Sequence, residues 1–498
     1  MDSQFDSPAN SSPEVEYEDG TKIPGRPATN LIYIPTGPFS NLSEEGDFYT
    51  IPVYPSLGKM HGRVLEGLSP KLLELLEKML GPGLCNNTGR KEWAAKSQKE
   101  KRQSESMVQD QELVHLHQML FTVFYAKETR RMTLTIRPWR LMASHEDEIS
   151  QPLAHDIHRK VVIFMPIDPF QWQNDDAAKM YGWFENAKSQ HRDVEIYPSR
   201  DESYQSAYKL PDIKALDDIA SDPQTPFEFQ FRPKTCIGKG RCTLADDEGD
   251  QVFKGTFSSS GCHVRKGKRT DELCKDLLKC TLPGEPVKLT KTSAARDGDV
   301  AEPLPGRSWF HQEFVESLWQ WGELRVFMVG NKIEYILFSS KGDHKVPPQV
   351  NVSRFRAEHH FGWIEDQQKR LAKIDELHRF CHFERESLLS KYPTLFDTMH
   401  VGVRFDVGIS HIAEDCRFFI NETTRWTQAA FYSKEWASHP YDELSMPLGR
   451  RFARLYGGII PEVEAKAEGW ADNAREKIEV LQEGMVKLKF NKSKCGKS

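Results

Sequence analysis

Residues 403–424 read VRFDVGISHIAEDCRFFINETT, two apolar runs separated by a polar turn. The pattern predicts a β-hairpin, because alternating strand-forming residues flank a short polar segment. Successive side chains of a strand point to opposite faces, so Arg404 and Asp406 share one face of the first strand. Glu422 and Thr424 share one face of the second strand for the same reason. Antiparallel pairing would bring Asp406 and Glu422 together across the hairpin.

This pair of acids indicates a cation site. Two carboxylates that face each other on neighbouring strands repel unless a cation lies between them. Each acid also follows an aromatic-rich apolar run, where an unpaired charge is costly. Mg²⁺ prefers hard oxygen ligands and nucleotide phosphates, which suits this pair. The alternative is that one or both acids point to solvent.

A second stretch, DQVFKGTFSSSGCHVRKG at residues 250–267, places Lys254 at the end of an apolar run. Small residues follow it, and they let backbone N–H groups approach phosphate oxygens closely. A lysine at this position supplies a mobile positive charge for the same phosphates. A plain surface hairpin explains the stretch equally well.

A third stretch, HQEFVESLWQWGELRVFMVG at residues 311–330, could form a hinge that offers backbone groups to an adenine. Within it, Glu323 and Arg325 lie two residues apart on one predicted strand and face the same side. An acid suits ribose hydroxyls and an arginine suits a phosphate. The alternative is a half-buried strand with an ion pair that faces solvent.

In this order, the three stretches resemble the ATP-grasp superfamily over about residues 225–435. The resemblance implies ATP held between two α+β subdomains, with one or two Mg²⁺ ions. It also implies roles for individual residues. The phosphates would be bound by Lys254, Ser258, Ser259, Ser260 and Gly261. Glu313 and Val315 would line the adenine site, and Glu323 would bind the ribose. Arg325 and Arg404 would face the transferred phosphoryl group or an acidic substrate, and Asp406 and Glu422 would bind the metal.

The resemblance implies one further residue, and the metal hairpin departs from the family pattern. The family carries a further lysine on an earlier strand, for which Lys234 or Lys239 is the candidate. Its metal hairpin ends Glu-x-Asn, whereas this chain reads Asn421-Glu422-Thr423-Thr424. Thr424 would then stand at the asparagine position, or Asn421 would supply the amide, which affects the second metal.

The reaction that the resemblance implies is ligation, in which ATP phosphorylates a carboxylate and an amine or similar nucleophile attacks the acyl phosphate. The substrates would be small-molecule or peptide carboxylates and amines, with Arg325 and Arg404 as catalytic residues. The alternative is a non-catalytic or weakly catalytic ATP-binding assembly factor of the cell-division-cycle 123 type, with a protein partner.

The fold expected is mixed α+β and α/β, with an ATP-grasp-like pair of subdomains after an α/β lead-in domain. The predicted boundaries run along the chain in five parts. These are a disordered acidic tail at 1–27, the lead-in domain at 28–220 with an exposed basic loop near 81–110, a small subdomain with the phosphate loop at 221–320, a metal-binding subdomain at 321–460 with a helical insertion at 351–396, and a C-terminal helix and tail at 461–498.

Composition narrows the class of protein. The 498 residues carry 67 Lys and Arg against 73 Asp and Glu, which argues against a nucleic-acid or membrane-surface role for the whole chain. No apolar stretch approaches a membrane span, and no signal peptide is evident, so a cytoplasmic location is expected. Five of the nine cysteines cluster in Cys236, Cys242, Cys262, Cys274 and Cys280. Their C-x5-C pairs are wider than structural zinc sites usually show, which favours ordinary thiols.

Overall fold

The computed structural model describes residues 14–16, 22–34, 119, 122–136, 160–165, 174–190, 193–246, 249–256, 264–275, 277–281, 308–341, 350–429 and 444–461. The chain divides into two compact units. The first comprises Met1–Pro166, Ala178–Tyr197 and Ala430–Ser498. The second comprises Ile167–Ala177 and Pro198–Ala429. The predicted basic loop near 81–110 lies outside the described residues, as does the predicted C-terminal helix beyond Pro461.

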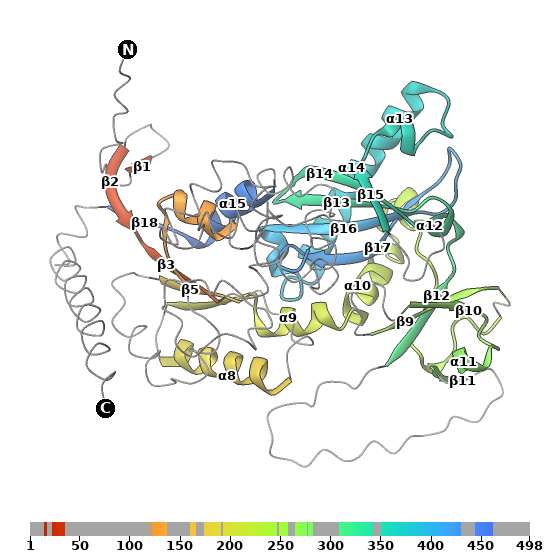
Figure 1. Ribbon diagram of the computed structural model, residues 1–498, viewed down its shortest axis with the longest axis horizontal. Helices are drawn as coiled ribbons and strands as arrows, with labels where there is room; N and C mark the ends of the chain where they lie inside the picture. The colour runs from red at the N-terminus through yellow and green to blue at the C-terminus, as the bar shows by residue number, and fades with distance from the viewer. Residues whose placement is uncertain are drawn as a thin grey trace, which may run out of the picture. The chain divides into compact units, whose positions relative to one another are not determined.

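The first unit contains a parallel four-stranded sheet in the order β4-β3-β5-β6 (Figure 1). Its strands are rich in β-branched residues, and Val161 to Phe164 are all buried, as is usual when helices cover both faces of a parallel sheet. The strands are β3 (Thr29–Tyr33), β4 (Met132–Ile136), β5 (Lys160–Phe164) and β6 (Val194–Tyr197). The described helical residues of this unit lie in α15 (Met446–Tyr456), in most of α8 (Asn174–Gln190) and at 119 and 122–128.

A small antiparallel sheet joins the two ends of the chain in the same unit. It has the order β1-β2-β18, with strands β1 (Glu14–Glu16), β2 (Lys22–Pro27) and β18 (Ile459–Pro461). Strands β1 and β2 lie within the segment 1–27, whose composition predicts disorder, so the structure differs from that expectation at these strands.

The second unit is built around an antiparallel five-stranded sheet in the order β15-β14-β13-β16-β17. The strands are β13 (Glu323–Val329), β14 (Lys332–Lys341), β15 (Val350–Arg354), β16 (Gly402–Ile409) and β17 (Phe418–Arg425). The hairpin predicted from residues 403–424 is present as β16–β17, and β13 and β14 form a second hairpin. The turn of this second hairpin, at Val329-Gly330-Asn331-Lys332 between two alternating apolar runs, is also typical of a hairpin in the sequence. Gly330 turns the β13–β14 hairpin with a φ of 56°, a conformation that glycine adopts at little cost.

Alternate residues of this sheet face a single hydrophobic core. Leu324, Val326, Phe405 and Val407 belong to it, together with Phe380 on the long helix α14. The helices that lie wholly within this unit range in length from four to 25 residues among the described residues. They are α9 (Arg200–Ala207), α10 (Leu210–Ala220), α11 (Glu272–Lys275), α12 (Glu316–Gln320), α13 (Ala357–His360) and α14 (Gln367–Lys391), with 3-10 turns η2 (Phe227–Phe229) and η3 (Asp397–His400). The polar residues that alternate with the core residues therefore point to the other face of the sheet.

A four-stranded antiparallel sheet in the order β10-β9-β12-β7 completes the second unit, beside a parallel pair, β11-β8. The strands are β7 (Thr235–Cys236), β8 (Lys239–Arg241), β9 (Gln251–Gly255), β10 (Val264–Gly267), β11 (Lys279–Thr281) and β12 (Trp309–Glu313). Residues 314–322, including α12, connect β12 to β13 and so join this sheet to the five-stranded one.

Two local predictions from the sequence are wrong. The alternating run FEFQFRPKT at 227–235 predicts a strand, but residues 227–229 form the 3-10 turn η2 and only Thr235 enters a strand. Pro226 precedes the run and Pro233 lies within it, and a proline cannot donate a ladder hydrogen bond. The predicted helical segment 351–396 begins with residues of β15, and its long helix starts only at Gln367.

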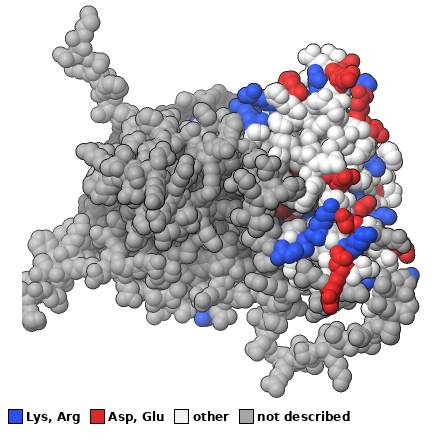
Figure 2. Space-filling model, turned by 45° about the vertical axis from the view of Figure 1, so that its right-hand side comes forward, with Lys and Arg blue, Asp and Glu red and all other residues white. Residues whose placement is uncertain are grey.

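The mixed α/β class with several sheets is confirmed. Among the described residues, no helix is long and apolar enough to cross a membrane. On the face drawn in Figure 2, the described basic and acidic side chains are interspersed.

Candidate active site

The five-stranded sheet brings three carboxylates together on the face opposite the core. Arg325 on β13 is paired with Asp406 on β16, and Asp406 is paired in turn with Glu422 on β17. Glu323 lies two residues before Arg325 and shares its face. The predicted encounter of Asp406 and Glu422 across the hairpin is therefore confirmed by the register.

A β-bulge in β17 explains the unusual Asn-Glu order of this hairpin. Asp406 pairs with Glu422, but the next residue, Val407, pairs with Ile420, so Asn421 is the extra residue. A bulge bends the strand and re-aims a side chain locally. Here it brings the amide of Asn421 into the same polar cluster as Glu422, although the two are neighbours in sequence.

Asn421 connects the four-stranded sheet of the second unit with the five-stranded one. Its Oδ1 atom accepts a hydrogen bond of 3.1 Å from Nζ of Lys254 on β9. Its Nδ2 atom donates one of 3.0 Å to Oε2 of Glu323 on β13. The lysine of the four-stranded sheet thus reaches the acids of the five-stranded sheet, as expected if both sheets contribute to one site.

Arg404 holds Asp406 in a bidentate ion pair on strand β16. Its Nε and Nη2 atoms donate to the two oxygens of Asp406 at 2.8 and 2.9 Å, and Nη2 also donates to Oγ1 of Thr424 at 3.1 Å. Both members of the pair are buried. A buried, bidentate pair of this kind fixes both side chains firmly in place.

Arg325 is less fully engaged. Its Nη2 atom lies 3.8 Å from Oε1 of Glu323, which is a long distance for an ion pair. Its Nε atom is buried and has no hydrogen-bond partner among the described residues. A buried N–H group without a partner is uncommon, and an anion bound beside it would supply the missing acceptor.

Lys209 is a residue of the site that the sequence motifs did not indicate. Its Nζ atom lies 3.0 Å from Oε1 of Glu422. Lys209 precedes helix α10 and has a φ of 44°, which is rare for a residue with a side chain. Such strained backbone persists only where its surroundings hold it, and it is concentrated at functional sites. The only sequence signal was the Lys-Leu-Pro start of the helix.

Burial, and after it the neighbouring charges, shift the pKa values of this cluster. Burial, followed by the charge of Asp406, raises the pKa of Glu323 to about 7. Burial, followed by the charge of Lys209, lowers the pKa of Lys254 to about 8. Burial acts to raise the pKa of Glu422, but the charges of Lys209 and Arg404 outweigh it and lower the pKa overall.

The predicted adenine hinge is ordered by contacts of its own. Glu313, at the end of β12, donates its N–H to the carbonyl of Lys234 at 2.9 Å and accepts the N–H of Lys234 through its carboxylate at 3.2 Å. Val315 is buried just before α12. Lys234 and Lys239 are both exposed, Lys239 on β8.

The predicted phosphate loop, Ser258 to Gly261, lies outside the described residues. The structure thus brings together Lys254, Glu323, Arg325, Arg404, Asp406, Asn421, Glu422 and Thr424, and it adds Lys209. Their individual roles in binding and catalysis stay predictions.

No family model and no curated protein matches this chain by sequence. Among solved structures, the chain is similar to the D-cycloserine synthetase DcsG, with a TM-score of 0.38 and 11% identity over 68% of this chain and 95% of that one. It is similar to the ATP-grasp ligase PsnB complexed with its minimal precursor, with a TM-score of 0.33 and 12% identity over 60% of this chain and 78% of that one. It is also similar to a RimK domain ATP-grasp protein from Sphaerobacter thermophilus, with a TM-score of 0.33 and 9% identity over 70% of this chain and 95% of that one. The structures to which this chain is similar therefore include ATP-grasp ligases, the class that the motif order predicted.

Proposed function

We propose that this protein is an ATP- and Mg²⁺-dependent ligase that joins a carboxylate to an amine or similar nucleophile through an acyl phosphate. The observation that carries the proposal is the contact of Lys254 with Asn421 and, through it, with Glu323. This contact places a lysine from one sheet among the acids and arginines of another. Cations beside a cluster of acids suit a nucleotide phosphate that binds together with a metal ion.

The cations of the site would bind and neutralise the phosphates. Lys254 would meet the phosphate oxygens as a point charge, and Arg325 would donate its unpartnered Nε–H to one of them. Arg404, fixed by Asp406, would face the transferred phosphoryl group or the acidic substrate. Donors that are already in place cost little reorganisation when charge develops in the transition state.

The residues present fit a hard divalent cation. Glu323, Asp406 and Glu422 supply carboxylate oxygens and Asn421 an amide oxygen, and burial, followed by the charge of Asp406, raises the pKa of Glu323. We propose Asp406 and Glu422 as metal ligands, with Asn421 or Thr424 adding an oxygen. When bound, Mg²⁺ supplies further neutralisation of the phosphate charge.

The proposed reaction balances without a protein nucleophile. A carboxylate oxygen of the acid attacks the γ-phosphorus of ATP, which gives an acyl phosphate and ADP. The amine nitrogen then attacks the acyl carbon, phosphate leaves with the electron pair of the broken C–O bond, and the amine loses a proton to solvent. The protein contributes position and electrostatics. We place the reaction in the cytoplasm, with small-molecule or peptide substrates and without a nucleic-acid or membrane partner.

One observation favours the second candidate, an ATP-binding assembly factor with little or no turnover. Asp406 is paired with Arg404, and Glu422 with Lys209, so both proposed metal ligands have a side-chain cation beside them. A protein that only binds ATP could keep these pairs throughout. A ligase must loosen at least the more exposed pair, that of Lys209 and Glu422, when the metal binds.

Release of ADP tests the two candidates. Purified protein with Mg-ATP is supplied with panels of carboxylic acids and amines, separately and together. The ligase predicts ADP only when a matching acid and amine are both present. Tight ATP binding with no ADP under any pair favours the assembly factor, and no ATP binding contradicts both.

An arginine variant makes this test specific to the site. Arg325→Met should lower kcat/KM for ATP by about 10–100-fold, because it removes a charged hydrogen bond to a phosphate. Arg379→Met is the matched control, since Arg379 is exposed on α14 and paired only weakly with Glu228 at 3.9 Å. Equal rates in the two variants would show that Arg325 does not contact ATP.

A further inference from the structure

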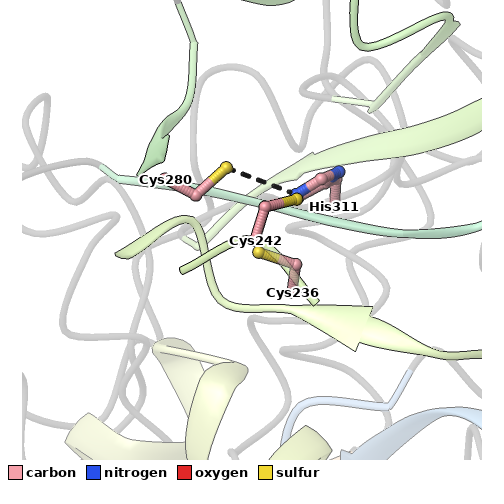
Figure 3. Close-up of side chains that lie close together, drawn as sticks. All are labelled: Cys236, Cys242, Cys280 and His311. Carbon is pink, nitrogen blue, oxygen red and sulfur yellow. Dashed lines mark hydrogen bonds between the residues drawn. The ribbon is translucent and has the colours of Figure 1, made fainter. Parts of the chain in front are cut away.

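A separate cluster of buried cysteines lies where the four-stranded sheet of the second unit meets the parallel pair β11-β8. Cys236, Cys242, Cys280 and His311 are all buried, and their Sγ and ring nitrogen atoms lie within 4.8 Å of one another. Figure 3 shows the three sulfur atoms and Nε2 of His311 converging on one point. Their positions in the chain span 75 residues, so the fold alone gathers them.

Two distances within the cluster match those of a tetrahedral metal site. Zinc holds thiolate sulfur at about 2.3 Å and imidazole nitrogen at about 2.0 Å, so sulfur and nitrogen ligands on a tetrahedron lie about 3.6 Å apart. In this structure, Nε2 of His311 lies 3.6 Å from Sγ of Cys242 and 3.7 Å from Sγ of Cys280.

Neighbouring groups orient the ligands as they do around known metal centres. Nδ1 of His311 lies 2.6 Å from Oε1 of Gln251, and because an amide oxygen can only accept, Nδ1 carries the proton. Nε2 is then left with its lone pair directed at the sulfur atoms, an arrangement typical of a metal-binding histidine. The ring of Phe253 stacks on that of His311 and holds its plane.

The loop between the first two cysteines is shaped to bring both to one point. Gly238 and Gly240 have φ values of 73° and 68°, which turn the chain sharply between Cys236 and Cys242. A Cβ atom at Gly238 would lie 2.1 Å from the carbonyl oxygen of Trp309, so only glycine fits there. The backbone N–H groups of Gly238 and Thr243 hydrogen-bond to the sulfur of Cys236.

The apolar cluster around the cysteines is small. Among the described residues it contains Leu244 besides the cysteines, with Ala245 and Leu278 packed against it. Small folding units with so little core usually rely on a metal or a disulfide. The described cysteines of the cluster form no disulfide bond with one another.

We propose that Cys236, Cys242, Cys280 and His311 bind one zinc ion in a closed, structural site. Thiolates with an imidazole select zinc over hard cations, and four protein ligands leave no open position for a substrate. Binding releases the protons of whichever thiols are still protonated. The proposal departs from the expectation of ordinary thiols because His311, the fourth residue of the cluster, lies 31 residues beyond Cys280.

The proposed zinc ion would tie β7, β11 and β12 and the end of β8 into one body. Strand β12 pairs with β9, where Phe310 lies opposite Lys254. The metal would therefore steady the strand that carries the lysine of the candidate active site. This inference does not depend on the proposed ligase activity, because the site is defined by its own residues.

Metal analysis of the full-length protein tests the proposal. Protein purified without chelators should contain one zinc per chain. Cys242→Ser should lose the metal, whereas Cys274→Ser should keep it, because Cys274 is also buried in this region but is not one of the converging residues. Absence of zinc from wild-type protein together with thiols that all react freely, or a disulfide within the cluster, would overturn the proposal. So would stoichiometric iron or copper.

Cobalt substitution keeps the test decisive if the serine variant fails to fold. Wild-type protein stripped of metal and reloaded with Co²⁺ should show the visible absorption of tetrahedral cobalt and a thiolate-to-metal charge-transfer band. A colourless or octahedral cobalt complex would contradict the assignment.

Gln251→Ala probes the orientation of His311 without touching a ligand. Loss of such a partner typically weakens metal affinity by about 10–100-fold, so zinc should pass faster to a competing chelator. An unchanged rate of transfer would show that Gln251 does not orient a metal ligand.

Discussion

At the residue scale, the surroundings of Lys254 disfavour its protonated, charged form. Its pKa is lowered to about 8, chiefly by burial and then by Lys209. Only the protonated lysine attracts phosphate, so the affinity for Mg-ATP should fall as the pH rises above about 8. Calorimetric titration of Mg-ATP between pH 7 and pH 9.5 measures this.

Lys254→Arg is the control for this prediction, because arginine stays charged throughout that range. The variant should bind Mg-ATP with little change between the same two pH values. The same bend near pH 8 in both proteins would assign it to another group and contradict the role of Lys254.

Glu323 gives a prediction that concerns the free energy of unfolding. Its pKa is raised to about 7, first by burial and then by Asp406, above the ordinary 4.5. A carboxyl group whose folded pKa is raised favours the native state at low pH, and this contribution is lost as the pH rises from 4.5 through 7. Glu323→Gln mimics the protonated form at every pH. It should therefore raise the free energy of unfolding at pH 8 by at most about 3 kcal/mol, and by much less at pH 5.

Urea unfolding of wild type and variant at the two pH values measures the difference. A variant that is less stable than wild type at pH 8 would show that the charge of Glu323 is stabilised in the fold.

At the element scale, a buried network ties helices α9 and α10 to strand β17. Arg425 donates to Glu202 at 3.0 Å and to Asp212 at 2.5 and 3.0 Å, and its guanidinium lies over the ring of Phe396. Glu202 in turn accepts both the hydroxyl and the amide of Thr398. The network fixes the end of β17 next to Thr424, and it positions the helix that follows Lys209.

Removal of the Arg425 guanidinium, which Glu202 and Asp212 share, should lower the free energy of unfolding. Arg425→Met leaves Glu202 and Asp212 buried without their partner, which typically costs about 3–5 kcal/mol of unfolding free energy. Arg417→Met is the matched control, since Arg417 directly precedes the same strand and its guanidinium packs only on two phenylalanine rings. That contact is worth about 0.5–1 kcal/mol. Equal losses in the two variants, measured by urea unfolding, would contradict the importance of the network.

The elements also show what could be predicted from the sequence. Strand alternation placed Asp406 opposite Glu422, since the period of two is fixed by backbone geometry and the turn is short. The bulge at Asn421 and the contact with Lys209 could not be predicted, because both depend on how distant segments pack. The Arg425 network joins residues more than 200 positions apart in the chain, and no local pattern encodes that contact.

At the scale of the whole molecule, the first unit is assembled from both ends of the chain. Phe452 and Tyr456 on α15 pack on Phe164 and Tyr197 of the parallel sheet, with ring centroids 5.0–5.4 Å apart. Thr29 donates to the carbonyl of Tyr456 in the same region. The C-terminal part of the chain therefore supplies core residues to a sheet that begins near the N-terminus.

A core substitution in the first unit tests whether that unit is needed for ATP binding. Phe452→Ala should destabilise the first unit by about 3–5 kcal/mol, because it leaves a cavity against the sheet. All the residues that we assign to ATP and metal belong to the second unit. The rise in melting temperature with Mg-ATP should therefore persist in this variant. Loss of the ATP response, measured in the same thermal scans, would show that the first unit is needed for binding.

The most direct test of the central claim is thermal stability with and without Mg-ATP, for wild type and for Glu422→Gln. Ligand at 100 times its dissociation constant should stabilise the wild type by about 2.7 kcal/mol, which gives a clear rise in melting temperature. The rise should be much smaller in Glu422→Gln, whose side chain is 40% exposed, so the substitution itself should cost little stability. Glu414→Gln, an exposed acid paired with Lys369, should keep the full rise. No rise in wild type at millimolar Mg-ATP would contradict an ATP site on this sheet.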